Sequence, residues 1–129
     1  MRKQQVFLML TLVSLAVLAQ GCVIAAVGAG AAGTVAYIKG DLTAVEAKDL
    51  DAVYKATEKA MADLKLNITT KAKDAMSAKI IARDSQDKKI KVKLSATAEG
   101  TTKLSIRVGT FGSETKSRLI YEQIKKNLK

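Results

Sequence analysis

The sequence predicts an α+β domain over residues 41–129, in which an antiparallel sheet of four to five strands carries two helices on one face. The first observation is the strict alternation of apolar and polar residues over 89–94 and 103–108, which is typical of strands with one buried face. The second is that apolar residues recur every three or four positions in two other segments, which indicates amphipathic helices. The expected order is β-α-β-β-β-β-α, so the helices form a second layer on the sheet.

The first strand and the first helix open this domain. Residues 41–47 alternate apolar and polar side chains, which predicts a short strand. Asp49 is a candidate N-cap, and Asp51 in the next turn complements the positive end of a helix dipole. One apolar face then continues over residues 50–65, so we expect a helix there. That face consists of Leu50, Val53, Tyr54, Thr57, Ala60, Met61 and Leu64.

Four further strands and a second helix complete the predicted fold. The strands are expected at residues 66–71, 78–83, 89–94 and 103–108, with polar turns between them. The last two strands direct six apolar side chains inward: Ile90, Val92, Leu94, Leu104, Ile106 and Val108. Ser113 is a candidate N-cap of the second helix. The apolar face of that helix consists of Leu119, Ile120, Tyr121, Ile124 and Leu128.

The composition argues against several classes of function. The chain has 22 Lys and Arg against 12 Asp and Glu, a net charge of +10, one Cys and no His. Without His it lacks the Ser-His-Asp and Cys-His pairs of nucleophilic catalysis, and a single Cys gives no ligand set for structural zinc. Asp84 and Asp87 flank a predicted turn, and no predicted helix or strand pairs either of them with a second acid across a pocket. We therefore expect no enzyme activity, no cofactor and no metal site.

The N-terminal segment has the organisation of a signal peptide. A basic start at residues 1–3 precedes an uncharged apolar stretch at residues 6–19. This stretch is short for a membrane span, which needs about 20 residues. Residues 18–22 follow, with the sequence Leu-Ala-Gln-Gly-Cys, and they resemble a bacterial lipobox in which the bond between Gly21 and Cys22 is cleaved. Ala stands where Leu is usual, three residues before the Cys.

The lipobox resemblance implies that residues 1–21 are removed and that Cys22 carries a diacylglycerol on sulfur and an acyl chain on its new amine. Three acyl chains anchor a protein effectively permanently, because each buried CH₂ contributes about 0.8 kcal/mol. Residues 22–40 are then an apolar Gly/Ala tether, and we expect the domain in the bacterial cell envelope, at the outer membrane facing the periplasm. The alternatives are an ordinary secretory signal with a free Cys, an uncleaved membrane helix over residues 6–38, and a Cys buried in an N-terminal core helix.

Basic side chains are expected on the outward face of the last two strands. Lys91 and Lys93 share one face of their strand, and Lys103 and Arg107 are expected beside them on the next strand. Like charges directly opposite each other destabilise a sheet, so this face indicates an anionic partner: phospholipid headgroups, lipopolysaccharide phosphates or an acidic envelope protein. A solvated face without a ligand is the other interpretation and the commoner case, since Lys also protects strands from mispairing. Nucleic acid is not expected, because 4% aromatic content leaves few side chains for base stacking.

The turn at Thr110 and Phe111 is a second candidate for binding. Phe111 lies between two glycines, just after the last strand. An aromatic residue in such a turn either anchors the protein to a partner or covers the end of a small core. Covering the core is the commoner use, and we expect it here.

The chain resembles a family of small, uncharacterised bacterial lipoproteins whose domain has no known function. The resemblance rests on the lipobox with Cys22, the Gly/Ala run through Gly33, the segment Ala36-Tyr37-Ile38-Lys39-Gly40, and above all Ile106-Arg107-Val108-Gly109-Thr110-Phe111-Gly112. It implies a location and a fold, and it supplies neither catalytic residues nor a ligand.

Three functional hypotheses follow from these features. The first is a non-catalytic, membrane-anchored envelope protein that interacts through a basic sheet face or maintains the envelope. The second is a periplasmic binder or carrier of a small lipid or apolar ligand, held between sheet and helices. An apolar cavity of several hundred Å³ distinguishes the second from the first. The third is an inner-membrane protein with an uncleaved N-terminal span. The sequence does not indicate an oligomeric state.

Overall fold

The structure is a computed structural model that describes residues 3–5, 34–97 and 100–129. The chain divides into two compact units, residues 1–31 and residues 32–129. Among the residues so described, no helix is long and apolar enough to span a membrane.

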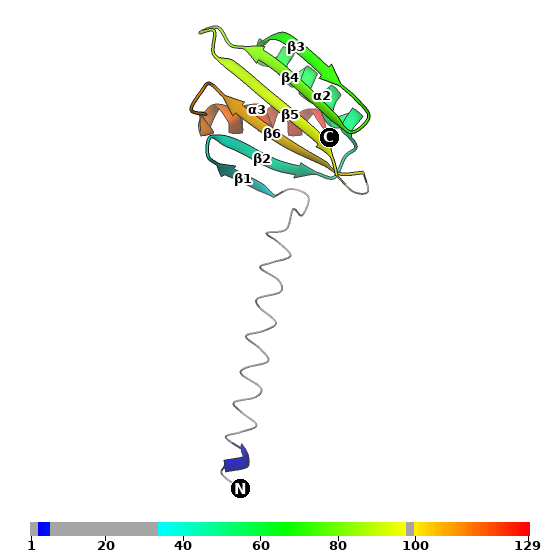
Figure 1. The fold of residues 1–129 in the computed structure, drawn as a ribbon, viewed down its shortest axis with the longest axis vertical. Helices are drawn as coiled ribbons and strands as arrows, with labels where there is room; N and C mark the ends of the chain where they lie inside the picture. Colours follow the sequence, from blue (N-terminus) through cyan, green and yellow to red (C-terminus); the bar gives the residue numbers. More distant parts are fainter. Residues whose placement is uncertain (1–2, 6–33, 98–99) are drawn as a thin grey trace. The chain divides into compact units, whose positions relative to one another are not determined.

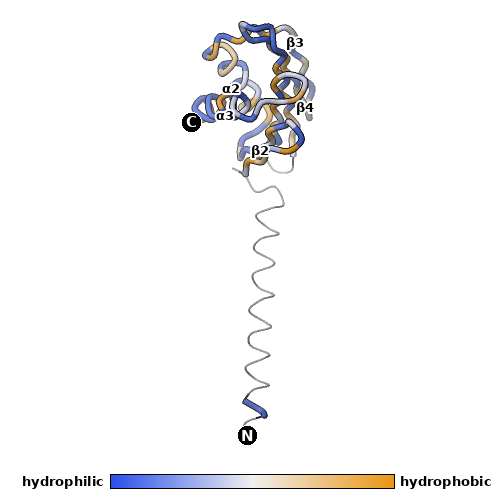
Figure 2. The backbone as a smooth tube through the Cα atoms, turned by 90° about the vertical axis from the view of Figure 1, so that its left-hand side faces the viewer, coloured by the Kyte–Doolittle hydropathy of each residue, from blue (hydrophilic) through white to orange (hydrophobic). Residues whose placement is uncertain are grey.

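The second unit is the expected α+β fold, with helices on one side of an antiparallel sheet (Figures 1 and 2). Its strands are β1 (Val35–Ile38), β2 (Asp41–Glu46), β3 (Asn67–Lys73), β4 (Ser77–Arg83), β5 (Lys89–Ala96) and β6 (Thr102–Val108). Its helices are α2 (Leu50–Asp63) and α3 (Glu114–Asn127). The spatial order of the strands is β1-β2-β6-β5-β4-β3, and each neighbouring pair is antiparallel.

The sheet has six strands rather than four or five because β1 pairs with β2 at one edge. The two strands are joined by a two-residue turn at Lys39 and Gly40, both of which have positive φ, as a tight hairpin turn requires. Residues 35–40 of the expected tether therefore belong to the folded domain. Four residues are too few for an alternating pattern to stand out beside a long apolar run. The signal peptide, Gly21, Cys22 and the tether up to residue 33 lie outside the described residues.

Both predicted helix caps are confirmed. The Ala52 N–H donates a hydrogen bond to Asp49 Oδ1 at 2.8 Å, and the Lys116 N–H donates to Ser113 Oγ at 3.5 Å. Helix α2 ends at Asp63, two residues earlier than expected, because Lys65 adopts a positive φ that a helix cannot include.

The core fills the space between the sheet and the helices. The six inward residues predicted on the two alternating strands are all buried, with at most 2% of their surface exposed. They pack with buried residues of β2, β4, α2 and α3 in one continuous cluster, and all of these residues lie between Leu42 and Ile124. Unit 32–129 therefore contains its whole core, and we expect a chain that starts at Thr34 to fold by itself.

Side-chain bonds also join the two layers. The buried Tyr121 of α3 donates a short hydrogen bond from its hydroxyl to the Glu46 carboxylate of β2. Burial, and then the neighbouring carboxylate, raise the pKa of Tyr121 above its ordinary value. At the other end of the sheet, Lys71 Nζ lies 2.8 Å from Glu58 Oε1 of α2. These contacts fix α2 and α3 against the inner face, so neither of these two helices covers the outer face.

Candidate functional site: a basic sheet face and the hollow at its end

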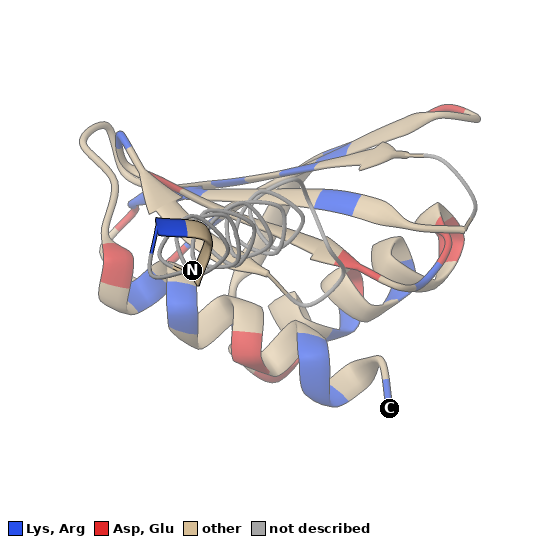
Figure 3. Cartoon of the chain, turned by 90° about the horizontal axis from the view of Figure 1, so that it is seen from below, with Lys and Arg blue, Asp and Glu red and all other residues tan. Residues whose placement is uncertain are grey.

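The structure places the four predicted basic residues on the outer face, opposite the helices. Lys91 and Arg107 are directly opposite each other across β5 and β6. Lys93 lies opposite Ser105, and Lys103 lies opposite Ser95, in the same pairing. In Figure 3, Lys and Arg recur along the strands of the sheet layer. The four residues therefore form one surface.

This surface carries more cations than the sequence pattern identified. Outer positions of the described strands hold seven basic residues and a single acid, Asp41. We call the seven the basic face: Lys79, Arg83, Lys89, Lys91, Lys93, Lys103 and Arg107. Lys79, Arg83 and Lys89 were not predicted for this face: Lys79 and Arg83 lie on β4, and Lys89 is the first residue of β5. The signal was present, since Lys79 and Arg83 alternate with Ala78, Ile80 and Ala82.

Each cation at an outer position of β5 has another cation directly across from it. The like-charged pairs are Arg83 with Lys89, Lys79 with Lys93, and Lys91 with Arg107. Such pairs destabilise a sheet by roughly 0.2–1 kcal/mol each. Three of them around one central strand are an electrostatic cost that the fold itself does not require.

Acidic partners relieve only part of this repulsion. Arg83 lies 3.5 Å from Asp87, and Arg107 lies 3.1 Å from Asp41. The Arg107 guanidinium also donates to the main-chain carbonyl of Lys39 at 3.2 and 3.3 Å, so it ties the β1–β2 turn to β6. Arg107 is thus partly structural. The lysines of the basic face form no ion pair with any residue that the structure describes.

A surface hollow of about 690 Å³ lies at the end of the basic face. Its walls are the β4–β5 turn and the loop between β6 and α3. Five cations line it, against the single acid Asp87: Arg83, Lys88, Lys89, Lys91 and Arg107. A smaller hollow of about 260 Å³ adjoins it over the strands and shares Lys91 and Arg107. Together the two hollows give an anion a concave, positively charged place to bind.

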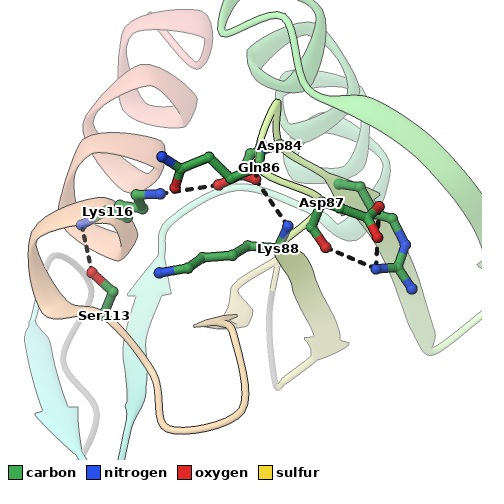
Figure 4. Close-up of polar contacts among 7 residues, drawn as sticks. Asp84, Gln86, Asp87, Lys88, Ser113 and Lys116 are labelled. Carbon is green, nitrogen blue, oxygen red and sulfur yellow. Dashed lines mark hydrogen bonds and ion pairs between the residues drawn. The ribbon is translucent and has the colours of Figure 1, made fainter.

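The β4–β5 turn is held against the start of α3 by polar contacts (Figure 4). Asp84 Oδ2 lies 3.0 Å from Lys116 Nζ of α3. Asp84 Oδ1 accepts hydrogen bonds of 2.9 Å from the main-chain N–H groups of Gln86 and Lys88. The Lys116 ammonium, followed by the Lys88 N–H, lowers the pKa of Asp84 below its ordinary value. Asp84 therefore stays ionised and fixes one wall of the hollow.

The loop that forms the other wall packs tightly against the β1–β2 turn. A Cβ added to Gly112 would lie 2.4 Å from the Gly40 oxygen and 2.7 Å from the Tyr37 hydroxyl. A Cβ added to Gly40 would lie 2.7 Å from the carbonyl oxygen of Phe111. Segments 36–40 and 106–112 both carry the family resemblance in the sequence. These short distances make them neighbours in space.

Phe111 does not cover the core, contrary to expectation. Its side chain is 92% exposed, at the tip of the loop that lines the hollow. The end of the core is closed without it, because Val108 is buried at the end of β6. The structure agrees with the other interpretation, in which Phe111 is an exposed residue in a turn between two glycines.

Other kinds of site find little support in the described ranges. Within residues 3–5, 34–97 and 100–129, no group of three or more Cys, Asp or Glu side chains is placed to hold a metal ion. Asp84 bonds to its own turn and to Lys116, and Asp87 pairs with Arg83. A third hollow, of about 350 Å³, lies between the start of α2 and the ends of two hairpins and includes Asp49, Asp51, Lys73 and Asp74.

Comparison with known proteins gives a family and no activity. Residues 5–127 match the family described as "Protein of unknown function (DUF3568)". No curated protein matches the chain.

Proposed function

The chain belongs to the DUF3568 family of proteins of unknown function, and we propose from its own residues that it is a lipid-anchored bacterial envelope protein. In this proposal its folded domain is a non-catalytic interaction module that presents the basic face to an anionic partner. The compartment is the periplasmic side of the outer membrane.

The anchor part of the proposal rests on the N-terminal sequence. A basic start, a 6–19 apolar stretch of signal-peptide length and a cysteine at position 22 occur in the order that lipoprotein processing needs. Acylation of Cys22 then holds the protein on a membrane without a spanning helix.

The three like-charged pairs around β5 are the observation that carries the interaction part. Lys protects a free sheet edge from mispairing, but β5 lies inside the sheet, where Lys opposite Lys or Arg adds only repulsion. An anion bound on this face removes the repulsion and gains attraction from several cations at once.

The intact mass of the protein extracted from membranes tests the anchor. We expect the mass of residues 22–129 plus three acyl chains, and we expect Cys22→Ala to remain unprocessed and unacylated. The unprocessed mass of residues 1–129 in the unaltered protein would contradict the proposal, because the N-terminal segment would then be retained.

Charge reversal at Lys93 tests the basic face. In a chain that starts at Thr34, Lys93→Glu replaces a repulsive pair with Lys79 by an attractive one, so we expect stabilisation by about 1 kcal/mol and a Tm about 5 °C higher. The same change weakens binding to anionic surfaces. Lys59→Glu on the exposed side of α2 alters the net charge equally and is the control. Equal stability of the two variants, measured by urea unfolding, would show that the face is not strained by its own charge.

A further inference from the structure

Phe111 and the cations around it form an amphiphilic corner on the domain. Phe111 is 92% exposed between Gly109 and Gly112, which have φ of 73° and 82°. Lys88 and Lys89 line the hollow on one side of it. On the other side, its carbonyl oxygen faces Gly40, in the turn that follows the 60% exposed Ile38. An apolar tip therefore projects from a cationic rim.

We propose that this corner docks the domain on an anionic phospholipid bilayer, with a headgroup phosphate in the 690 Å³ hollow and Phe111 inserted into the apolar layer. This inference rests on the proposed function and names the partner of its basic face. The five cations beside one carboxylate attract the negatively charged phosphates of clustered headgroups. The adjacent Phe111 side chain can enter the region where the headgroups meet the acyl chains.

A bilayer fits these features better than an acidic protein or free phosphate does. A soluble anion gains nothing from an exposed Phe at the rim of its site, whereas an interface rewards both the charge and the apolar tip. Cys22, if acylated, also lies close in the chain. Residues 22–34 span at most about 45 Å in any conformation, so an anchored domain meets headgroups at a high effective concentration. A modest affinity for the surface is then sufficient for docking.

Tryptophan fluorescence tests the proposal directly, because the chain has no Trp of its own. The protein is the chain starting at Thr34 with Phe111→Trp, folded as judged by circular dichroism. The probes are vesicles of phosphatidylcholine alone and vesicles with equal parts of phosphatidylglycerol. We expect the emission to shift to shorter wavelength with the anionic vesicles only. Met76→Trp, at the opposite end of β4 and 63% exposed in the native protein, is the control that stays unshifted.

Co-sedimentation with the same vesicles measures the contribution of charge. Exchange of Lys89 and Lys91 for Gln together should weaken binding roughly 30-fold, whereas the paired exchange of Lys55 and Lys59 on α2 should change it less than threefold. Phe111→Ser should weaken binding about tenfold.

Each other outcome overturns the inference in a recognisable way. Co-sedimentation without a shift of Trp at position 111 means that the basic face binds lipid in another orientation, so this corner is not the docking site. Absence of binding to anionic vesicles, together with binding to polyglutamate, assigns the face to an acidic protein. Because these assays use a chain without Cys22, they succeed or fail independently of the acylation measured by intact mass.

Discussion

Replacing Gly112 with alanine should lower the free energy of unfolding by about 3 kcal/mol or more, one of the two largest effects expected of a single substitution in this domain. Gly112 has a φ of 82°, which costs a residue with a Cβ roughly 1–2 kcal/mol. The added methyl group would also lie 2.5 Å from the Gly40 Cα, and neither backbone can yield without moving a hairpin. Overpacking of this kind typically costs a further 1–3 kcal/mol.

Gly109 provides the matched control for this substitution. It has a similar φ of 73°, it belongs to the same loop, and a Cβ built on it meets nothing within 4 Å. Gly109→Ala should therefore show the conformational strain alone, about 1 kcal/mol. Urea unfolding of the chain from Thr34 measures both variants. If they lost the same stability, the β1–β2 turn and the 109–112 loop would not be in contact.

The contact at Gly112 also shows where prediction from the sequence ended. Five strands and two helices were predictable because alternation and three-to-four spacing persist over six or more residues in most of them. The caps at Asp49 and Ser113 were predictable because a capping residue acts only on its own first turn. The turn at Gly40 lies about seventy residues from Gly112 in the chain. Gly40 and Gly112 each indicate an unusual backbone conformation in the sequence. No feature of the neighbouring residues indicates that the two backbones are in contact.

The candidate site also has features that the sequence predicted and features that depend on the three-dimensional structure. The sequence alone predicted one shared face for four residues, because side chains alternate between the two faces of a strand. The four are Lys91, Lys93, Lys103 and Arg107. Which cation lies opposite which depends on register, and register is set by turn lengths and the core together. Arg107 was grouped with the lysines, although its guanidinium holds the Lys39 carbonyl and Asp41. The exposure of Phe111 was mispredicted because the buried end of β6 was already closed by Val108.

The assignment of the two sheet faces can be tested with two adjacent isoleucines on one strand. Ile80 is 1% exposed and points into the core, whereas Ile81 lies half-buried on the outer face opposite Lys91. Ile80→Ala should cost about 3–4 kcal/mol, because it removes packed atoms and leaves a cavity. Ile81→Ala should cost about 1 kcal/mol, since only a partly covered surface and some strand preference are lost. For a domain of this size, the difference amounts to roughly 15 °C in Tm.

This comparison bears on function as well as on stability. Because side chains alternate between faces, a strand shifted by one residue would bring Lys79 to the core and Ile80 to solvent. The large effect at Ile80 and the small one at Ile81 would establish that Lys79 and Arg83 share the exposed face with the lysines of β5. Comparable losses at the two positions would instead mean that both faces are covered. The basic face would then not be free to meet an anionic surface, and the proposed docking would lose its basis.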